Sequence, residues 1–320
     1  AEIRSVGPDG EAAVDASTIE LTDDQIAQIK EGGYTAAICL HYGGNDWSTS
    51  QQKGLEDTFG ELGIEIVAVT DANFSAETQV SNIETVMAKK PDILVSIPTD
   101  ATATADAYKQ AAAAGIKIVF MDQRANGLEA GKDYVSVVSA DNYGNGYASG
   151  TVLGDALGGK GKVAMVYYDA NFAPTNQRDE GFRDAMKNYP DIEIVTEQGF
   201  TDESGCAEQG DAILTQFPNI DGIYASWDVP MEGVLSAVRA AGMEGKVTLA
   251  CNDLGNNVAR EIASGNIAGG GAQMPYDQGV AEAKLAALAL LGEETPSYVA
   301  VPAETVTHEN VLEAYTDVYH

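Results

Sequence analysis

Residues 64–67 read Ile-Glu-Ile-Val, and residues 192–195 read the same four letters. Both tetrapeptides are short apolar runs that follow segments of helical spacing, so each is predicted to be a buried strand. Three further landmarks recur in the same order at nearly the same offset, about 130 residues. They are Gly54-Leu55 with Gly181-Phe182, Pro91-Asp92-Ile93 with Pro218-Asn219-Ile220, and Asp122 with Asp253. The chain is therefore predicted to contain a duplicated α/β unit.

Apolar strands alternate with helices around each copy of the repeat. Thr35–Leu40 and Ile116–Met121 are predicted strands of the first copy, and Gly222–Ala225 and Val247–Cys251 are predicted strands of the second. Met231–Ala241 has helical spacing and ends at a glycine. Strands that are apolar throughout and lie between helices indicate a parallel sheet covered on both faces. The fold class is therefore α/β, with two doubly wound parallel-sheet lobes.

The two ends of the chain do not form a third lobe. Residues 1–33 are acidic and weakly patterned, with one short helix predicted over Thr22–Lys30. From Asn266 onward the pattern predicts one strand, helices over Asp277–Leu291 and Asn310–Tyr319, and a short Tyr298–Val301 segment. These elements are too few for a separate core, so we expect them to complete both lobes and to make the chain cross between them more than once.

Composition narrows the class of function. The 320 residues include 18 basic and 49 acidic side chains, which gives a formal net charge of −31. Such a surface repels phosphate backbones and anionic membranes, so we expect no nucleic-acid partner. No apolar run is long enough to span a bilayer. The chain starts on polar residues, so either the protein is cytoplasmic or the numbering begins after a cleaved leader. Three widely spaced cysteines are expected to be buried free thiols: Cys39, Cys206 and Cys251.

Polar and aromatic side chains follow the predicted strands, where open α/β sheets bind ligands. In the first lobe they are Tyr42, Asn45, Trp47, Asp122 and Gln123, and in the second they are Arg178, Trp227, Asp253 and Gln273. Carboxylates, amides and a guanidinium pair with hydroxyl groups, and aromatic faces cover C–H patches. This mixture fits a sugar or a polyol. Asp100 and Asp228 also follow strands, but we expect them to cap helices.

Motifs for catalysis or for a cofactor are missing from the sequence. Gly144-Asn145-Gly146, followed by Ser149-Gly150, resembles a dinucleotide loop, but its third glycine position is Ser and close helix packing explains it better. The chain has no phosphate-binding loop, nucleophile elbow or paired-His metal motif. We therefore predict no catalytic residue, no metal site and no cofactor. An acid–base pair of Asp122 with Asp253, as in glycoside hydrolysis, is the weaker alternative.

A linked series of motifs from about Tyr34 to the C-terminus resembles the ribose-type, cluster B, sugar-binding proteins of bacterial ABC importers. This family is related to the ligand cores of lactose-repressor-type regulators. The motifs are Asn45-Asp46-Trp47, Ser96-Ile97-Pro98-Thr99-Asp100, Phe120-Met121-Asp122-Gln123, Ser139-Ala140-Asp141-Asn142, Gln177-Arg178-Asp179-Glu180-Gly181-Phe182, Trp227-Asp228, Asn252-Asp253 and Ala272-Gln273-Met274-Pro275.

The resemblance implies a periplasmic binding protein-like fold of type I, in which three crossover strands join lobes that close on one sugar. The crossovers would lie near Ala140, Gly271 and Pro302. One lobe would comprise residues 34–139 and 273–301, the other 140–272 and 302–320, and residues 1–33 would be an N-terminal extension. A monomeric periplasmic or extracytoplasmic protein, its leader removed, would deliver a monosaccharide or sugar alcohol to the permease subunits of an ABC importer.

By motif position, the ligand contacts of the family correspond to Asn45, Trp47, Asp122, Arg178, Trp227, Asp253 and Gln273. The sequence departs from the ribose-binding pattern at three places, where Ile97, Gln123 and Trp227 stand for Asn, Arg and Asn. A less polar pocket with a larger aromatic face favours another monosaccharide, a deoxy sugar or a linear polyol over ribose.

Three other functions remain as alternatives. A sensory protein that presents a sugar or a signal molecule to a membrane receptor would have the same fold. A repressor would need a basic DNA-binding N-terminus, and residues 1–33 are acidic and too few. A carbohydrate-active enzyme is the weakest alternative, because a fold alone does not assign chemistry.

Overall fold

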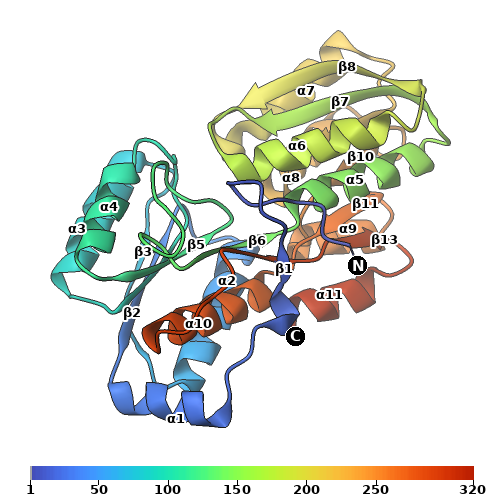
Figure 1. Ribbon diagram of the computed structural model, residues 1–320. Coiled ribbons are helices and arrows are strands. Elements are labelled where there is room, and N and C mark those ends of the chain that lie inside the picture. Colours follow the sequence, from blue (N-terminus) through green and yellow to red (C-terminus); the bar gives the residue numbers. More distant parts are fainter. Residues whose placement is uncertain (1) are drawn as a thin grey trace. The chain divides into compact units, whose positions relative to one another are not determined.

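The computed structural model describes residues 2–320 and divides into two compact units (Figure 1). Unit 1 holds residues 2–4, Asp141–Gln273 and Pro302–His320, and unit 2 holds Ser5–Ala140 and Met274–Val301. The chain therefore passes between the units after Arg4, Ala140, Gln273 and Val301. Three of these positions lie close to Ala140, Gly271 and Pro302, where the family resemblance implied crossovers. The fourth arises because the N-terminal extension begins in unit 1 and continues in unit 2.

Unit 2 is built on a seven-stranded sheet in which all neighbouring strands are parallel. In spatial order the strands are β1 (Val14–Asp15), β12 (Tyr298–Val301), β6 (Ser136–Ala140), β5 (Lys117–Met121), β4 (Ile93–Ser96), β2 (Thr35–Leu40) and β3 (Glu65–Asp71). The contacting helices α1 (Asp23–Gly32), α2 (Asp46–Glu61) and α10 (Pro275–Leu290) form one group, and α3 (Ala76–Ala88) and α4 (Ala105–Ala113) lie together apart from them (Figure 1). The central strands are buried, as a sheet covered on both faces requires.

Unit 1 is built on a six-stranded sheet. Its spatial order is β13 (Glu304–Thr307), β11 (Gly269–Ala272), β10 (Thr248–Cys251), β9 (Gly222–Ala225), β7 (Lys160–Tyr168) and β8 (Asp191–Phe200), with β13 antiparallel to β11. Its longer helices are α5 (Asn142–Ala156), α6 (Ala173–Met186), α7 (Cys206–Gln216), α8 (Asp228–Ala240), α9 (Asn256–Ala263) and α11 (Val311–Tyr319). Short 3₁₀ turns occupy Ala16–Thr18 in unit 2 and Glu203–Gly205 in unit 1.

The strand order confirms the duplication predicted from the repeated tetrapeptide. Unit 2 contains the run β3-β2-β4-β5-β6, and unit 1 contains β8-β7-β9-β10-β11. Each run is then extended by one late strand, β12 beside β6 and β13 beside β11. Asp122 and Asp253 therefore follow corresponding strands, β5 in unit 2 and β10 in unit 1.

Glycines let pairs of helices approach backbone to backbone in both units. A Cβ atom at Gly146 of α5 would overlap the carbonyl oxygen of Arg178 in α6. A Cβ atom at Gly54 of α2 would overlap the carbonyl oxygen of Tyr276 in α10. Close packing is thus confirmed as the reason for the small residues around Gly144-Asn145-Gly146.

The remaining sequence-level expectations concern cysteines and membrane spans. Cys39, Cys206 and Cys251 are free and buried, as expected. Among residues 2–320, every helix is too short or too polar to cross a bilayer.

Candidate functional site

Two aspartates end corresponding strands of the duplicated fold. Asp122 follows β5 and Asp253 follows β10, and both have left-handed backbones, with φ of 57° and 73°. The backbone N–H of Asp122 donates to the carbonyl oxygen of Val138 (2.9 Å), and that of Asp253 donates to Gly271 (2.9 Å). Left-handed backbone is costly for residues other than glycine, so it persists where surrounding contacts hold it.

Donors from neighbouring elements of unit 2 hold the Asp122 carboxylate. Its Oδ1 accepts hydrogen bonds from Ser139 Oγ (3.1 Å), the backbone N–H of Ala140 (3.2 Å) and Gln278 Nε2 (3.1 Å). The side chain is only 9 % exposed. Its direction at the carboxyl end of the sheet is therefore fixed in advance, which lowers the cost of ordering it around a ligand.

The Asp253 carboxylate of unit 1 lies between a cation and an amide. Gln273 Nε2 donates to its Oδ1, and Arg178 Nη1 lies 3.9 Å from its Oδ2. Burial raises the pKa of Asp253, and the Arg178 charge and the Gln273 hydrogen bond oppose that rise. Three of the predicted site residues are thus brought together in unit 1.

Arg178 is itself positioned by unit 1. Its Nε donates to Asn142 Oδ1 (2.9 Å) and its Nη1 to the carbonyl oxygen of Ser226 (3.4 Å). The next residue, Asp179, accepts on Oδ1 from Ser226 Oγ (2.7 Å) and from the Tyr224 hydroxyl (3.1 Å). Burial raises the pKa of Asp179 to about 6 despite those bonds. This buried network sets the position of the guanidinium group.

An aromatic group in unit 1 surrounds Trp227. The Trp227 ring meets Tyr168 edge-on at 5.6 Å and lies 5.3 Å from Phe200, both measured between ring centroids. Trp227 is 5 % exposed, and its indole Nε1 is buried without a hydrogen-bond partner. A buried donor that lacks a partner is costly, so it marks a place where a ligand acceptor would be favourable.

A second aromatic group lies in unit 2, beyond the end of β2. Tyr42 stacks on Phe74 with 4.2 Å between centroids, and His41 meets Trp47 edge-on at 5.7 Å. Phe74 and its neighbour Asn73 have φ of 63° and 47°. Two predicted contacts, Tyr42 and Trp47, are therefore joined by the same aromatic group.

Asn45 and Gln123, two further predicted ligand contacts, make hydrogen bonds within the protein. Asn45 is the N-cap of α2 and accepts on Oδ1 from the Ser48 N–H (2.9 Å). Gln123 Nε2 donates to the carbonyl oxygen of Pro98 (2.8 Å). The expectation that Asp228 caps a helix is wrong, because Trp227 holds the N-cap position of α8 and Asp228 Oδ2 accepts from the Gly255 N–H (3.0 Å).

Sequence reasoning missed three aromatic side chains near the site, namely Phe74, Tyr168 and Phe200. Tyr168 and Phe200 close neighbouring strands, β7 and β8. The predicted strand over Ile192–Val195 stopped short of Phe200, because the polar letters after Val195 resemble a loop. Pairing of β8 with β7 along the whole length of β7 places Phe200 beside Tyr168.

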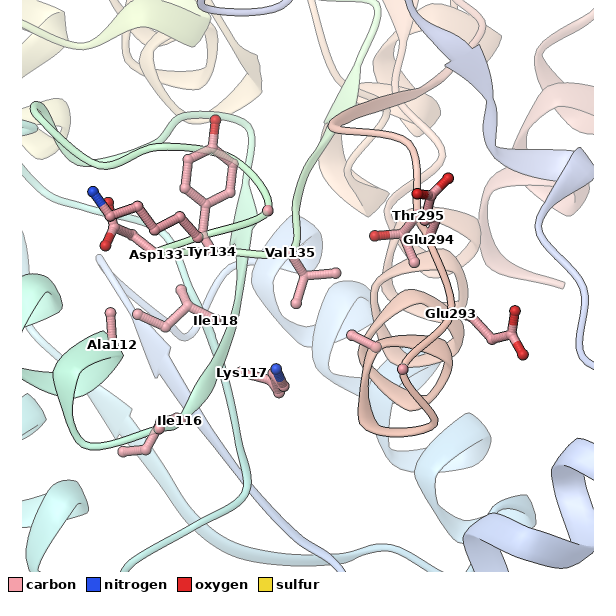
Figure 2. A pocket seen from close by; sticks show the side chains of 15 residues that line it. Ala112, Ile116, Lys117, Ile118, Asp133, Tyr134, Val135, Glu293, Glu294 and Thr295 are labelled. Atoms are coloured by element: carbon pink, nitrogen blue, oxygen red, sulfur yellow. The ribbon is translucent and has the colours of Figure 1, made fainter.

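A cavity of about 580 Å³ lies in unit 2 at the amino-terminal ends of β5 and β6, whereas Asp122 follows the carboxyl end of β5. Figure 2 shows Ile116 and Ile118 on one side of it and Glu293 and Glu294, beyond the end of α10, on the other. Lys117 also lines it, so charges of both signs surround the space. Among residues 2–320, the buried side-chain atoms that lack a partner belong to residues elsewhere. Volume is the only property of this cavity that suggests a site.

The amino-acid sequence matches a known protein family and a known sugar-binding protein. Residues 36–294 match the family model described as periplasmic binding protein domain. The D-ribose/D-allose-binding protein of Pseudomonas aeruginosa is 29 % identical over 273 residues, which cover 82 % of this chain and 83 % of that protein.

Solved structures of sugar-binding proteins have the same fold as this chain. A periplasmic solute-binding protein of an ABC transporter from Actinobacillus succinogenes, with bound D-allose, is 29 % identical with a TM-score of 0.80 and covers 88 % of this chain and 99 % of its own. A solute-binding protein from Agrobacterium vitis, bound with α-D-tagatopyranose, is 26 % identical with a TM-score of 0.83 and covers 90 % and 99 %. The chain belongs to the periplasmic binding protein family and shares its type I fold.

Proposed function

We propose that this protein is the solute-binding component of an ABC importer and captures a monosaccharide or a sugar alcohol. The sugar would contact Asp122 in unit 2 and Arg178, Trp227 and Asp253 in unit 1. Permease subunits would receive the loaded protein outside the cytoplasmic membrane, after removal of a leader peptide. The named relatives are binding proteins for sugars, which favours this function over an enzyme.

One observation carries the proposal. In both copies of the fold, a buried aspartate with a left-handed backbone follows the corresponding strand. Each carboxylate receives an amide N–H from a glutamine, Gln278 for Asp122 and Gln273 for Asp253. Burying carboxylates lowers stability unless they gain strong partners. Sugar hydroxyls are such partners, because each donates one hydrogen bond to a carboxylate and accepts another from a guanidinium or an amide.

The aromatic groups supply the rest of the contact. Trp47 and Tyr42 in unit 2 and Trp227 in unit 1 offer faces for the C–H patches of a sugar. The unpartnered Nε1 of Trp227 offers one further donor to a hydroxyl or a ring oxygen. Because Ile97, Gln123 and Trp227 replace more polar residues of the ribose-binding pattern, we expect a ligand other than ribose to bind best.

The test is calorimetry and thermal unfolding with a panel of D-allose, D-ribose, D-tagatose, D-fucose, allitol and myo-inositol, with L-leucine as the control. A compound present at one hundred times its Kd should raise the unfolding free energy by about 2.7 kcal/mol. Chromatography after incubation should recover the bound compound unchanged. Failure of every panel compound to bind at millimolar concentration, or its chemical conversion, would contradict the proposal.

A further inference from the structure

A cluster of fully buried polar side chains lies behind Asp122 in unit 2. Gln51 comes from α2, and Gln278 and Glu282 come from successive turns of α10. All three residues are 0 % exposed. We call them the α2–α10 polar cluster. Nothing in the proposed binding chemistry uses Gln51 or Glu282, and buried glutamates are rare unless a partner compensates for burial.

The helix crossing leaves these side chains no route to solvent. A Cβ atom at Gly279 would overlap the carbonyl oxygen of Gln51, and one at Gly54 would overlap that of Tyr276. The two backbones therefore touch beside the polar cluster, at Gln51 itself and one turn further along the helices. Polar atoms enclosed this way must satisfy one another.

Hydrogen bonds connect the cluster at both of its ends. Gln51 Nε2 donates to Glu282 Oε1 at 2.6 Å. Gln278 Nε2 donates to Asp122 Oδ1 at 3.1 Å and to the carbonyl oxygen of Val138 at 2.9 Å. Both N–H groups of the Gln278 amide are therefore used.

Three oxygen atoms of the cluster are buried and have no partner: Gln51 Oε1, Gln278 Oε1 and Glu282 Oε2. All three are acceptors if Glu282 is ionised, so the cluster would then lack donors. A neutral carboxyl group turns one of these acceptors into a donor. Glu282 lies four residues after Gln278 on α10, a spacing that puts two side chains on the same face of a helix, so its carboxyl group is within reach of the Gln278 amide.

The electrostatic surroundings of Glu282 also favour a neutral carboxyl group. Burial and the negative charge of Asp122 both raise the pKa of Glu282 well above its usual value. Among the described residues 2–320, no Lys or Arg side chain contributes an opposing effect. A second carboxylate charge near Asp122 would be costly in this buried environment.

We propose that Glu282 is a neutral carboxylic acid whose hydroxyl donates to Gln278 Oε1, which completes a relay from Gln51 through Glu282 and Gln278 to Asp122. Glu282 and Gln278 are then positioning residues for the Asp122 carboxylate. The relay fixes the Gln278 amide so that its N–H points at Asp122 Oδ1, and it keeps Asp122 the one charged carboxylate of the group. The positioning role rests on the proposed function, whereas the neutral state of Glu282 does not.

Infrared spectroscopy tests the neutral state without a ligand. Protein labelled with ¹³C in the glutamate carboxyl groups is compared with the Glu282→Gln variant at pH 7, in H₂O and after refolding in D₂O. The wild type should show a protonated-carboxyl band that shifts in D₂O and is missing from the variant. Identical spectra in the protonated-carboxyl region would overturn the relay.

Calorimetry with D-allose, or with the panel sugar that binds most tightly, tests the positioning role. Glu282→Gln keeps a neutral donor and should change Kd by less than about twofold, while Glu282→Leu should raise Kd about tenfold by removing about 1.4 kcal/mol of binding free energy. Rescue by Gln but not by Leu separates a donor role from simple filling of space. If Glu282→Leu does not fold, Gln51→Leu removes the first donor of the relay, and a Kd raised severalfold is then expected.

A matched control exists on the surface of α2. Gln52 Nε2 donates to Glu56 Oε1, also at 2.6 Å, but this pair is exposed. Glu56→Leu should leave Kd within about twofold of the wild type, because water replaces the lost bond. An infrared band together with unchanged Kd in the Leu variants would refute positioning while leaving Glu282 neutral. If no panel sugar binds the wild type, the proposed function fails, and the infrared result still decides the state of Glu282.

Discussion

Replacing Asp179 by Asn should change how stability depends on pH. Asp179 is 2 % exposed, and its Oδ1 accepts hydrogen bonds from Ser226 and Tyr224. Asn keeps an oxygen at that position but cannot ionise. Burial raises the pKa of Asp179 from 3.8 to about 6, so ionisation of this carboxyl opposes folding at neutral pH.

The sign and the size of the effect follow from proton linkage. A pKa that is higher in the folded state contributes stability below pH 3.8, and this contribution is lost as the pH rises through about 6. The full shift corresponds to about 3 kcal/mol, of which about 2 kcal/mol falls between pH 4.5 and pH 7.5. Relative to the wild type, Asp179→Asn should therefore gain about 2 kcal/mol of unfolding free energy over that range.

Urea unfolding at the two pH values measures this change, and any fixed cost of the new amide cancels in the difference. Asp184→Asn is the control on the same helix: Lys187 lowers the pKa of Asp184 below 3.8, so this carboxyl is ionised in the folded and the unfolded state between pH 4.5 and pH 7.5, and the difference from wild type should stay nearly constant. A difference between Asp179→Asn and wild type that stays constant with pH to within about 0.5 kcal/mol would refute the reasoning.

Three further substitutions test the binding site and its support. Trp227→Phe keeps an aromatic face but removes the unpartnered indole N–H, so calorimetry should show sugar binding weakened about fivefold with little change in stability; unchanged Kd would contradict this. Asp122→Ala should cost a few kcal/mol of binding free energy, and a loss under about 1 kcal/mol would remove Asp122 from the site. Gly146→Ala should destabilise the protein by about 1–3 kcal/mol and weaken binding, because the new Cβ overlaps the carbonyl oxygen of Arg178. Gly60→Ala, which meets no atom within 4 Å, is its control and should be neutral or stabilising in the same unfolding assay.

Much of the fold could be predicted because its strands are apolar runs with clear ends. The strands Thr35–Leu40 and Gly222–Ala225 have the predicted bounds, and the short segment noted at Tyr298–Val301 is strand β12. Close helix packing was predicted around Gly144-Asn145-Gly146, but the bounds of α5 were not. Asn142–Ala156 holds four glycines and lacks an apolar stripe, because this helix is buried by backbone contact. Strand β13 was missed because it is a short edge strand of mixed polarity.

Because open α/β sheets bind ligands beyond the carboxyl ends of their strands, candidate site residues could be chosen from the sequence. The neighbours that hold those residues could not be predicted in this way. Asp122 and Asp253 follow their strands as the repeat predicted. By contrast, the residues that flank Glu282 in the sequence do not distinguish it from a surface residue of an amphipathic helix. Its burial depends on Gly54 and Gly279 at a crossing of helices far apart in sequence. Such a contact is a property of packing, which local patterns do not encode.

The central claim is that this protein binds a neutral sugar or polyol reversibly and leaves it unaltered. Calorimetric titration of the ligand-free protein with the six panel compounds, followed by recovery and identification of the bound compound, tests it most directly. We expect saturable binding of one molecule per chain, with the compound recovered intact. An absence of heat and of thermal stabilisation for every compound, or recovery of a product, would contradict the claim.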